Sequence, residues 1–423
     1  MDEIDDCRKK RSSYELTALL TACLAMYLFK CGSRNAMTDL HDDEQFNENY
    51  TKIFKLPLPH PDTVNRVMTK LDDTQIERLK ITMVRVLIRR KVFCNQRFQG
   101  KYYSVAIDGT GVASFKHHHC SQCLSQTSKN GKTTYSHKVV EAHLVTYNGF
   151  SISLATEWIE NPADEEYDKQ DCERKAFTRI ATKLKKAFPQ LPIVILGDGL
   201  YPYEGFFAIC KANDWRYIVT FKEGNLKTVW RKIEKEKIAQ PNNKKQEIIR
   251  KPDKSIQESQ YIWFNDLNYR GYNLNYLECN ETITHSPDGK MKSIEYKHFI
   301  HISDLSLNEG NIARTNQTGR LRWKIENEGF NTLKNGGYCM KHKYSRTSYL
   351  AMKNYHQFMQ MASMINQLMV KTVQFKQNFL CVKNHKTLKS LWKDIVAVMQ
   401  WVSLDKAKLE IISMTRVQSC FIP

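Results

Sequence analysis

The sequence predicts an α/β protein whose mixed sheet is flanked by helices, interrupted by a β-rich insertion and framed by helical N- and C-terminal regions. Runs rich in β-branched and aromatic residues alternate with helical patterns between residues 99 and 221. Apolar residues recur at three- and four-residue spacing before residue 98 and after residue 311. We therefore expect a helical region at 1–98, an α/β core at 99–221 and 311–372, an insertion at 222–310 and a helical region at 373–423.

An apolar run at residues 16–29 is the part of the sequence closest to a membrane segment. It is shorter than the roughly 20 residues that span a bilayer, and the acidic residues before it do not match a signal peptide. We expect a buried helix of a cytoplasmic protein that contacts no membrane. The helical pattern around it fits either a DNA-binding bundle or a structural cap on the next domain.

Two predicted strands in the core each reach an aspartate. Residues 102–108 end at Asp108, and residues 193–198 end at Asp198. A hairpin at 139–155, helices at 173–187 and 204–212, and a strand at 216–221 complete the predicted core. Ligand sites in α/β sheets form where strands end, so the two aspartates are candidate site residues. The alternative is that each Asp-Gly pair only starts a turn.

A predicted helix at residues 320–334 supplies a third acid. Arg322 and Glu326 are four residues apart and share a face of that helix. An arginine one turn from a metal-binding glutamate can hold a phosphate or orient the carboxylate. The alternative is an ordinary surface ion pair. Glu328 is a nearby competitor, but it faces away from Arg322.

These residues together resemble a known family. An Asp on the first strand and an Asp on the fourth are followed by a β-rich insertion and the motif Arg-Trp-x-Ile-Glu-x-x-x-Phe-x-x-Leu-Lys at residues 322–334. This order resembles the bacterial insertion-sequence DDE transposases, the branch with a Tyr-Arg-Glu-Lys signature, over about residues 100–370. The resemblance implies an RNase H-like core in which Asp108, Asp198 and Glu326 hold two Mg²⁺ or Mn²⁺ ions. It also implies a homodimer on DNA.

The sequence departs from that signature at two positions. Gly319 stands where the signature has tyrosine, and Leu333 stands where it has lysine, with Lys334 one residue later. In a continuous α-helix that offset would rotate the lysine by about 100°. Arg322 therefore matches the signature, and the signature's tyrosine has no counterpart here. Lys334 is a phosphate-binding candidate one residue after the signature's lysine position.

A second candidate site is a loop rich in histidine and cysteine. Cys120 and Cys123 have the Cys-x-x-Cys spacing of half a zinc site, and His119 and His137 are candidate partners. His143 and the later pair Cys339 and His342 are further candidates. Such a structural zinc would brace the loop after Asp108. The alternative is a polar loop with two free thiols.

A basic composition points to a polyanionic partner. The chain has 64 Lys+Arg against 45 Asp+Glu, a formal charge of +19, and the alternatives to a nucleic-acid partner are a membrane surface and a basic solubilising face, between which charge alone does not choose. The insertion contributes many of these cations, and Trp230 and Trp263 are its candidates for stacking on an extruded base. The alternatives are a solvated helix face for the charges and core packing for the tryptophans.

The combined prediction is a nucleoid-associated DNA transposase that cleaves and joins double-stranded DNA at the ends of a mobile element. The first alternative is a DNA-binding protein derived from such an enzyme that has lost catalysis. The second is a nuclease on the same core that cuts DNA without joining it.

Overall fold

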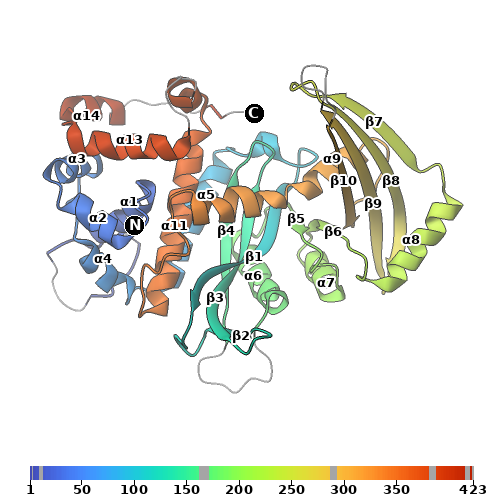
Figure 1. Ribbon diagram of the computed structural model, residues 1–423, viewed down its shortest axis with the longest axis horizontal. Helices are drawn as coiled ribbons and strands as arrows, with labels where there is room; N and C mark the ends of the chain where they lie inside the picture. Colours follow the sequence, from blue (N-terminus) through green and yellow to red (C-terminus); the bar gives the residue numbers. More distant parts are fainter. Residues whose placement is uncertain are drawn as a thin grey trace.

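The centre of the molecule is one mixed β-sheet of ten strands (Figure 1). The computed structural model describes residues 1, 3–8, 13–161, 171–285, 293–380, 387–414 and 420–421. The strand order is β2-β3-β1-β5-β6-β10-β9-β8-β7, with β4 also paired to β3. The strands are β1 (Tyr103–Phe115), β2 (Leu124–Thr127), β3 (Thr133–Val145), β4 (Ser151–Ile159), β5 (Ile193–Gly197), β6 (Arg216–Thr220), β7 (Lys244–Arg250), β8 (Ile256–Tyr269), β9 (Tyr272–His285) and β10 (Ser293–Ser303). The α/β class predicted from the sequence is confirmed.

The two faces of the sheet carry different helices, because alternate residues of a strand point to opposite sides. Val105 and Ile107 pack with α6, whereas Ala106 and Leu196 pack with Ile325 on the opposite face. The helices of the core are α6 (Glu173–Ala187), α7 (Glu204–Ala212), α9 (Ile312–Arg320), the π-helical turn η3 (Ile325–Asn331) and α10 (Thr332–Asn335). The segment predicted as one helix at 320–334 is therefore interrupted by a turn at 321–322, and its remaining part passes through a π-helical turn.

The N- and C-terminal helical regions form a single body beside the sheet, at the left of Figure 1. Helices from both ends share one apolar cluster, and the amide of Asn49 donates to the carbonyls of Met399 and Val402. The helices of the terminal regions are α1 (Leu16–Leu28), α2 (Arg34–His41), α3 (Glu44–Phe54), α4 (Pro61–Met68), α5 (Asp73–Arg89), η1 (Cys94–Gln96), α12 (Val373–Phe375), η4 (Lys376–Leu380), α13 (Leu388–Trp401) and α14 (Lys406–Met414). Helix α11 (Tyr349–Val370), which lies in the segment predicted as core, packs in the same apolar cluster.

The apolar run at the N-terminus is the buried helix α1, as predicted, and it packs against α11. Among the helices within the described residues, none has both the length and the apolar composition needed to cross a bilayer.

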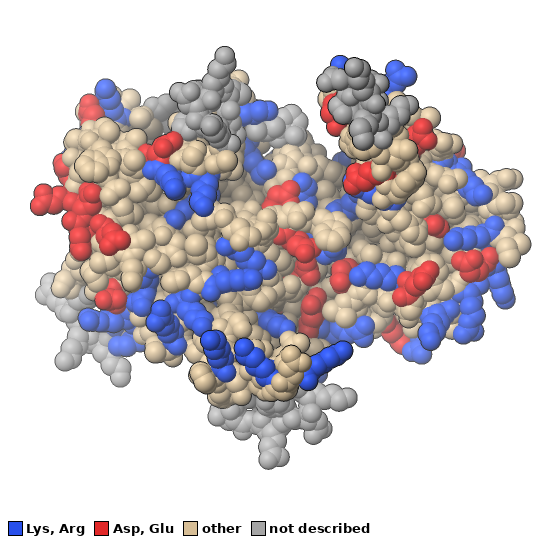
Figure 2. Space-filling view, in the orientation of Figure 1, with Lys and Arg blue, Asp and Glu red and all other residues tan. Residues whose placement is uncertain are grey.

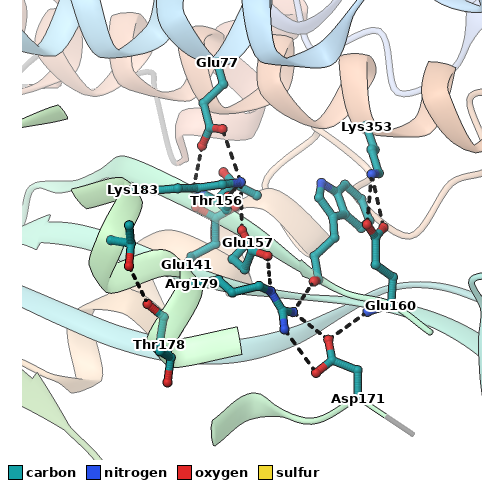
Figure 3. A network of polar contacts seen from close by, with 12 residues as sticks. Glu77, Glu141, Thr156, Glu157, Glu160, Asp171, Thr178, Arg179, Lys183 and Lys353 are labelled. Atoms are coloured by element: carbon teal, nitrogen blue, oxygen red, sulfur yellow. Dashed lines mark hydrogen bonds and ion pairs between the residues drawn. The ribbon is translucent and has the colours of Figure 1, made fainter. Parts of the chain in front are cut away.

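Charged side chains join this helical body to the sheet (Figure 3). Lys183 of α6 contacts Glu157 of β4 at 2.7 Å and Glu77 of α5 at 3.6 Å. Arg179, one turn earlier on α6, pairs with Glu157 and Asp171 at 2.5 Å each. Several of these carboxylates are largely buried, so the network fixes α5, α6 and β4 relative to one another.

The insertion continues the central sheet instead of forming a separate layer. Its strand β10 pairs antiparallel with β6, through His301 opposite Thr220, and β9, β8 and β7 follow outward. Helix α8 (Lys227–Ala239) precedes these strands and packs against β8 at the right of Figure 1. The predicted β-rich character of residues 222–310 is confirmed, and the helix weighed as the alternative for its charge run is present as α8.

Candidate active site

Asp108 and Asp198 lie at the same level on neighbouring parallel strands. The β1–β5 pairing runs in register to Ala106 and Leu196, and each aspartate follows two residues later. The prediction that the first strand ends at Asp108 is wrong, because β1 continues to Phe115 along its other neighbour β3. Asp108 lies within β1, at the level where the neighbouring strand β5 ends. Asp108 and Asp198 therefore lie at the same end of the paired part of β1 and β5.

Burial and neighbouring charge set the protonation of Asp108. Its carboxylate accepts a 2.9 Å hydrogen bond from the Gly109 N–H and lies 3.4 Å from the Arg322 guanidinium. Removal from water raises the pKa of Asp108 to about 6, and Glu173 and Asp198 add to that rise, while Arg322 opposes it. The site therefore carries more negative charge than its one arginine offsets.

Arg322 is the buried link between the helix segment and the strand. Its side chain is 9% exposed, and its guanidinium lies between Asp108 and Glu326, with 4.0 Å to a Glu326 oxygen. Glu326 itself remains half exposed, so its carboxylate has oxygens free for a ligand. The competitor Glu328 pairs with Lys324 at 2.7 Å. The structure thus brings together Asp108, Arg322 and Glu326 as the sequence predicted.

The π-helical turn η3 accounts for the position of Lys334. A π-turn closes hydrogen bonds over five residues instead of four and so accommodates one extra residue. Lys334 follows this turn, and its ammonium donates to Thr110 Oγ1 at 2.7 Å, two residues along β1 from Asp108. The rotation that a continuous α-helix would give Lys334 does not apply here, because residues 325–331 are π-helical.

Close packing explains the glycine at position 319. A Cβ added there would lie 2.7 Å from His301 and 2.9 Å from Ile218, closer than atoms pack without displacement. No larger side chain fits between α9 and the sheet at this point. Tyrosine at this position is therefore excluded by the backbone path.

Two groups beside the carboxylates were not anticipated from the sequence. Glu173, the first residue of α6, receives a 2.9 Å hydrogen bond from the buried hydroxyl of Tyr201. Burial raises the pKa of Glu173, and nearby Asp198 adds to the rise. A Cβ at Gly109 would lie 2.6 Å from the Glu173 carboxylate, so the glycine after Asp108 admits this fourth acid. The only signal in the sequence was an acid at a helix start, which is common.

The tryptophans of the insertion are packed within it. Trp230 stacks on Phe221 with ring centroids 4.8 Å apart and donates to the Lys222 carbonyl. Trp263 packs against the apolar cluster that includes Tyr261. By contrast, Trp323 beside Arg322 is 51% exposed. It borders an open groove of about 490 Å³ between β10 and η3, lined also by Lys297, His298, Phe299, Arg320 and Lys324.

The histidine and cysteine loop is only partly assembled as predicted. One ligand atom each from His119, Cys120 and His137 lies within 4.8 Å of the others. The Cys123 thiol instead donates to the Cys120 carbonyl at 2.9 Å. His143 bonds Ser151 within the sheet. Among the described residues, the group of potential ligands therefore contains three of the four predicted residues.

The sequence was also compared with protein-family models and with curated proteins, and neither comparison gives a match.

Proposed function

We propose that this chain is a DNA transposase that cleaves DNA at the ends of a mobile element and joins those ends to a target. The observation that carries the proposal is the register that sets Asp108 and Asp198 at the same level of neighbouring strands, together with Arg322, which contacts both Asp108 and Glu326. The acids are contributed by the first strand of the core, the fourth strand and a helical segment after the insertion.

An RNase H-like core is supported by the strand arrangement. Strands β1, β3 and β4 form an antiparallel meander, and β5 and β6 then add to β1 in parallel. The order β4-β3-β1-β5-β6 is the one that such a core would have. In this proposal the insertion extends the same sheet at its β6 edge.

The donor set fits Mg²⁺ or Mn²⁺, because these ions take carboxylate oxygens, waters and substrate phosphate together. The raised pKa of Asp108 also reflects carboxylate crowding, which a cation would relieve. Bound ions would supply an activated nucleophile and stabilise the leaving oxygen of an in-line displacement. Asp108, Asp198 and Glu326 would hold them. Arg322 and Lys334 would position the scissile phosphate.

The charge distribution supports a DNA partner. Lys and Arg side chains are spread over the face drawn in Figure 2, including the part formed by α8. The open groove beside η3 is lined by Lys297, Arg320 and Lys324, each paired with a glutamate, and by the exposed indole of Trp323. Cations there would neutralise phosphates, and the indole could stack on an unpaired base. We propose that the protein acts on double-stranded DNA as a homodimer.

Two assays test this function. With the DNA ends that flank the gene, Mg²⁺-dependent nicking should be lost in Asp198→Ala while DNA binding persists. Unchanged nicking in Asp198→Ala would refute the proposed site. Supplying precut ends then separates a transposase, which yields joined product, from a nuclease, which yields none. Tight DNA binding without either reaction in the wild-type protein would instead identify a non-catalytic DNA-binding protein.

A further inference from the structure

A second cluster of ligand-type side chains lies on the β1–β2–β3 part of the sheet, apart from the carboxylates. His119 and Cys120 are in the loop after β1, and His137 is on β3 opposite Ala113. The Cys120 sulfur is 3.4 Å from His137 Nε2, and all three residues offer a ligand atom within 4.8 Å. Two ligands of a tetrahedral zinc ion, with bonds of about 2.0–2.3 Å, are separated by roughly 3.3–3.8 Å.

The histidine nitrogens are arranged as they are around a metal. His119 Nε2 bonds the Arg346 carbonyl at 2.9 Å, which makes this nitrogen the donor and leaves Nδ1 with a free lone pair. That Nδ1 is buried and has no hydrogen-bond partner in the structure. His137 is fully buried, and its Nε2 faces the sulfur. Unpartnered buried nitrogens are costly, and a bound cation would satisfy the His119 lone pair.

Aromatic rings and a backbone amide hold the three ligands in place. Phe115 stacks on His119 with centroids 4.2 Å apart, and Tyr349 of α11 stacks on His137 at 4.1 Å. The N–H of Gln122 points at the Cys120 sulfur, as an amide does toward a thiolate. The site is therefore fixed before any ligand arrives.

We propose that His119, Cys120 and His137 bind one zinc ion, with water as the fourth ligand. Nitrogen and sulfur donors select zinc over the Mg²⁺ proposed for the carboxylates. Water reaches the ion from the adjacent open cavity of about 630 Å³, which is lined by His117, His118, His119 and Lys343. On binding, the Cys120 thiol loses its proton to solvent. The ion joins the loop after β1 to β3 and, through Arg346 and Tyr349, to the start of α11.

The test is zinc binding to the full chain without DNA. Protein treated with chelator and then dialysed against Zn²⁺ should retain about one zinc per chain by elemental analysis. Cys120→Ser and His119→Ala should reduce the affinity at least about tenfold. The matched variants Cys94→Ser and His41→Ala, which change a cysteine and a histidine away from this site, should bind like the wild type.

Cobalt(II) gives an independent readout. The Co²⁺-loaded wild-type protein should show a sulfur-to-metal charge-transfer band that is absent in Cys120→Ser, whereas cobalt on carboxylates gives no such band. A wild-type protein that retains zinc at far below one ion per chain would overturn the proposal, as would Cys120→Ser binding zinc as tightly as Cys94→Ser. Neither result depends on nicking or joining, so the zinc site and the transposase proposal are tested separately.

Discussion

At the scale of single residues, Asp108 is placed where burial and like charge oppose its ionisation. The strand holds it near Glu173 and Asp198, and burial together with these acids outweighs the opposing charge of Arg322. A carboxylate whose folded-state pKa is raised from 3.8 to about 6 costs the folded protein stability that grows as the pH rises between these values and stays constant above them. Such a cost is typical of a site arranged for a ligand that the free protein lacks.

Removing this carboxylate should therefore stabilise the metal-free protein. Above pH 6 the wild-type Asp108 is ionised at a cost, so Asp108→Asn should raise the free energy of unfolding by about 1–3 kcal/mol near pH 8. Near pH 4 the folded wild-type residue is protonated and the difference should shrink. Denaturant unfolding in chelator at both pH values measures this. An Asp108→Asn protein that is less stable than the wild type at both would contradict the electrostatic account.

The sequence predicted some site residues and missed others for physical reasons. Asp108 and Asp198 were found because a β-rich run before an acid is a local pattern, and Glu326 because Arg322 lies one helical turn away. Glu173 was missed because its approach to the site depends on the space left at Gly109. Trp323 was passed over for Trp230, because exposure is decided by tertiary packing that local patterns do not encode.

At the scale of elements, the π-helical turn η3 lets the residues before and after it both contact strand β1. Arg322 and Glu326 precede or begin the turn, and Lys334 follows it and meets Thr110. A Cβ added at Gly329 would lie within 3.1 Å of His143 and Ser151, so η3 packs closely against the sheet. A helix pattern alone does not reveal such a turn, which is why the sequence predicted one helix.

Deleting one exposed residue of η3 should convert the turn to α-helix without moving its flanks. Deletion of Asn327 should leave stability within about 1 kcal/mol of wild type and keep Lys334 on Thr110, since a π-turn carries one extra residue. Deletion of Lys324, before the turn, should instead rotate Glu326 by about 100° around the helix relative to Arg322 and reduce nicking. Thermal unfolding and a nicking assay compare the two. An equal loss of stability and nicking in the two deletion variants would show that η3 does not compensate for a missing residue.

At the scale of the whole molecule, contacts distant in sequence decide the architecture. The terminal helical regions were predicted as helical, but their union into one body rests on contacts such as Asn49 with Met399. The insertion was predicted as β-rich, but only the pairing of β10 with β6 shows that it extends the core sheet. Both features depend on pairings across long stretches of chain, which sequence patterns do not specify.

The basic insertion should contribute to DNA affinity through phosphate neutralisation. Arg231 and Lys235 of α8 are exposed, whereas Lys237 on the same helix pairs with Glu278 at 3.3 Å. Arg231→Ala together with Lys235→Ala should reduce the slope of log affinity against log salt by about 2. Lys237→Ala should change the slope less, because its charge is already paired. Binding titrations across salt concentrations measure this, and an unchanged slope in the double variant would exclude α8 from the interface.

The most direct test of the three-carboxylate site compares Glu326→Gln with Glu328→Gln. Both variants remove one charge from η3, but Glu326 faces Arg322 and Glu328 pairs with Lys324. In Mg²⁺- or Mn²⁺-dependent nicking and joining of the element's ends, Glu326→Gln should lose activity by at least about 10²-fold while still binding DNA. Glu328→Gln should stay near wild type. Full activity in Glu326→Gln would contradict the proposed site and require a different third ligand.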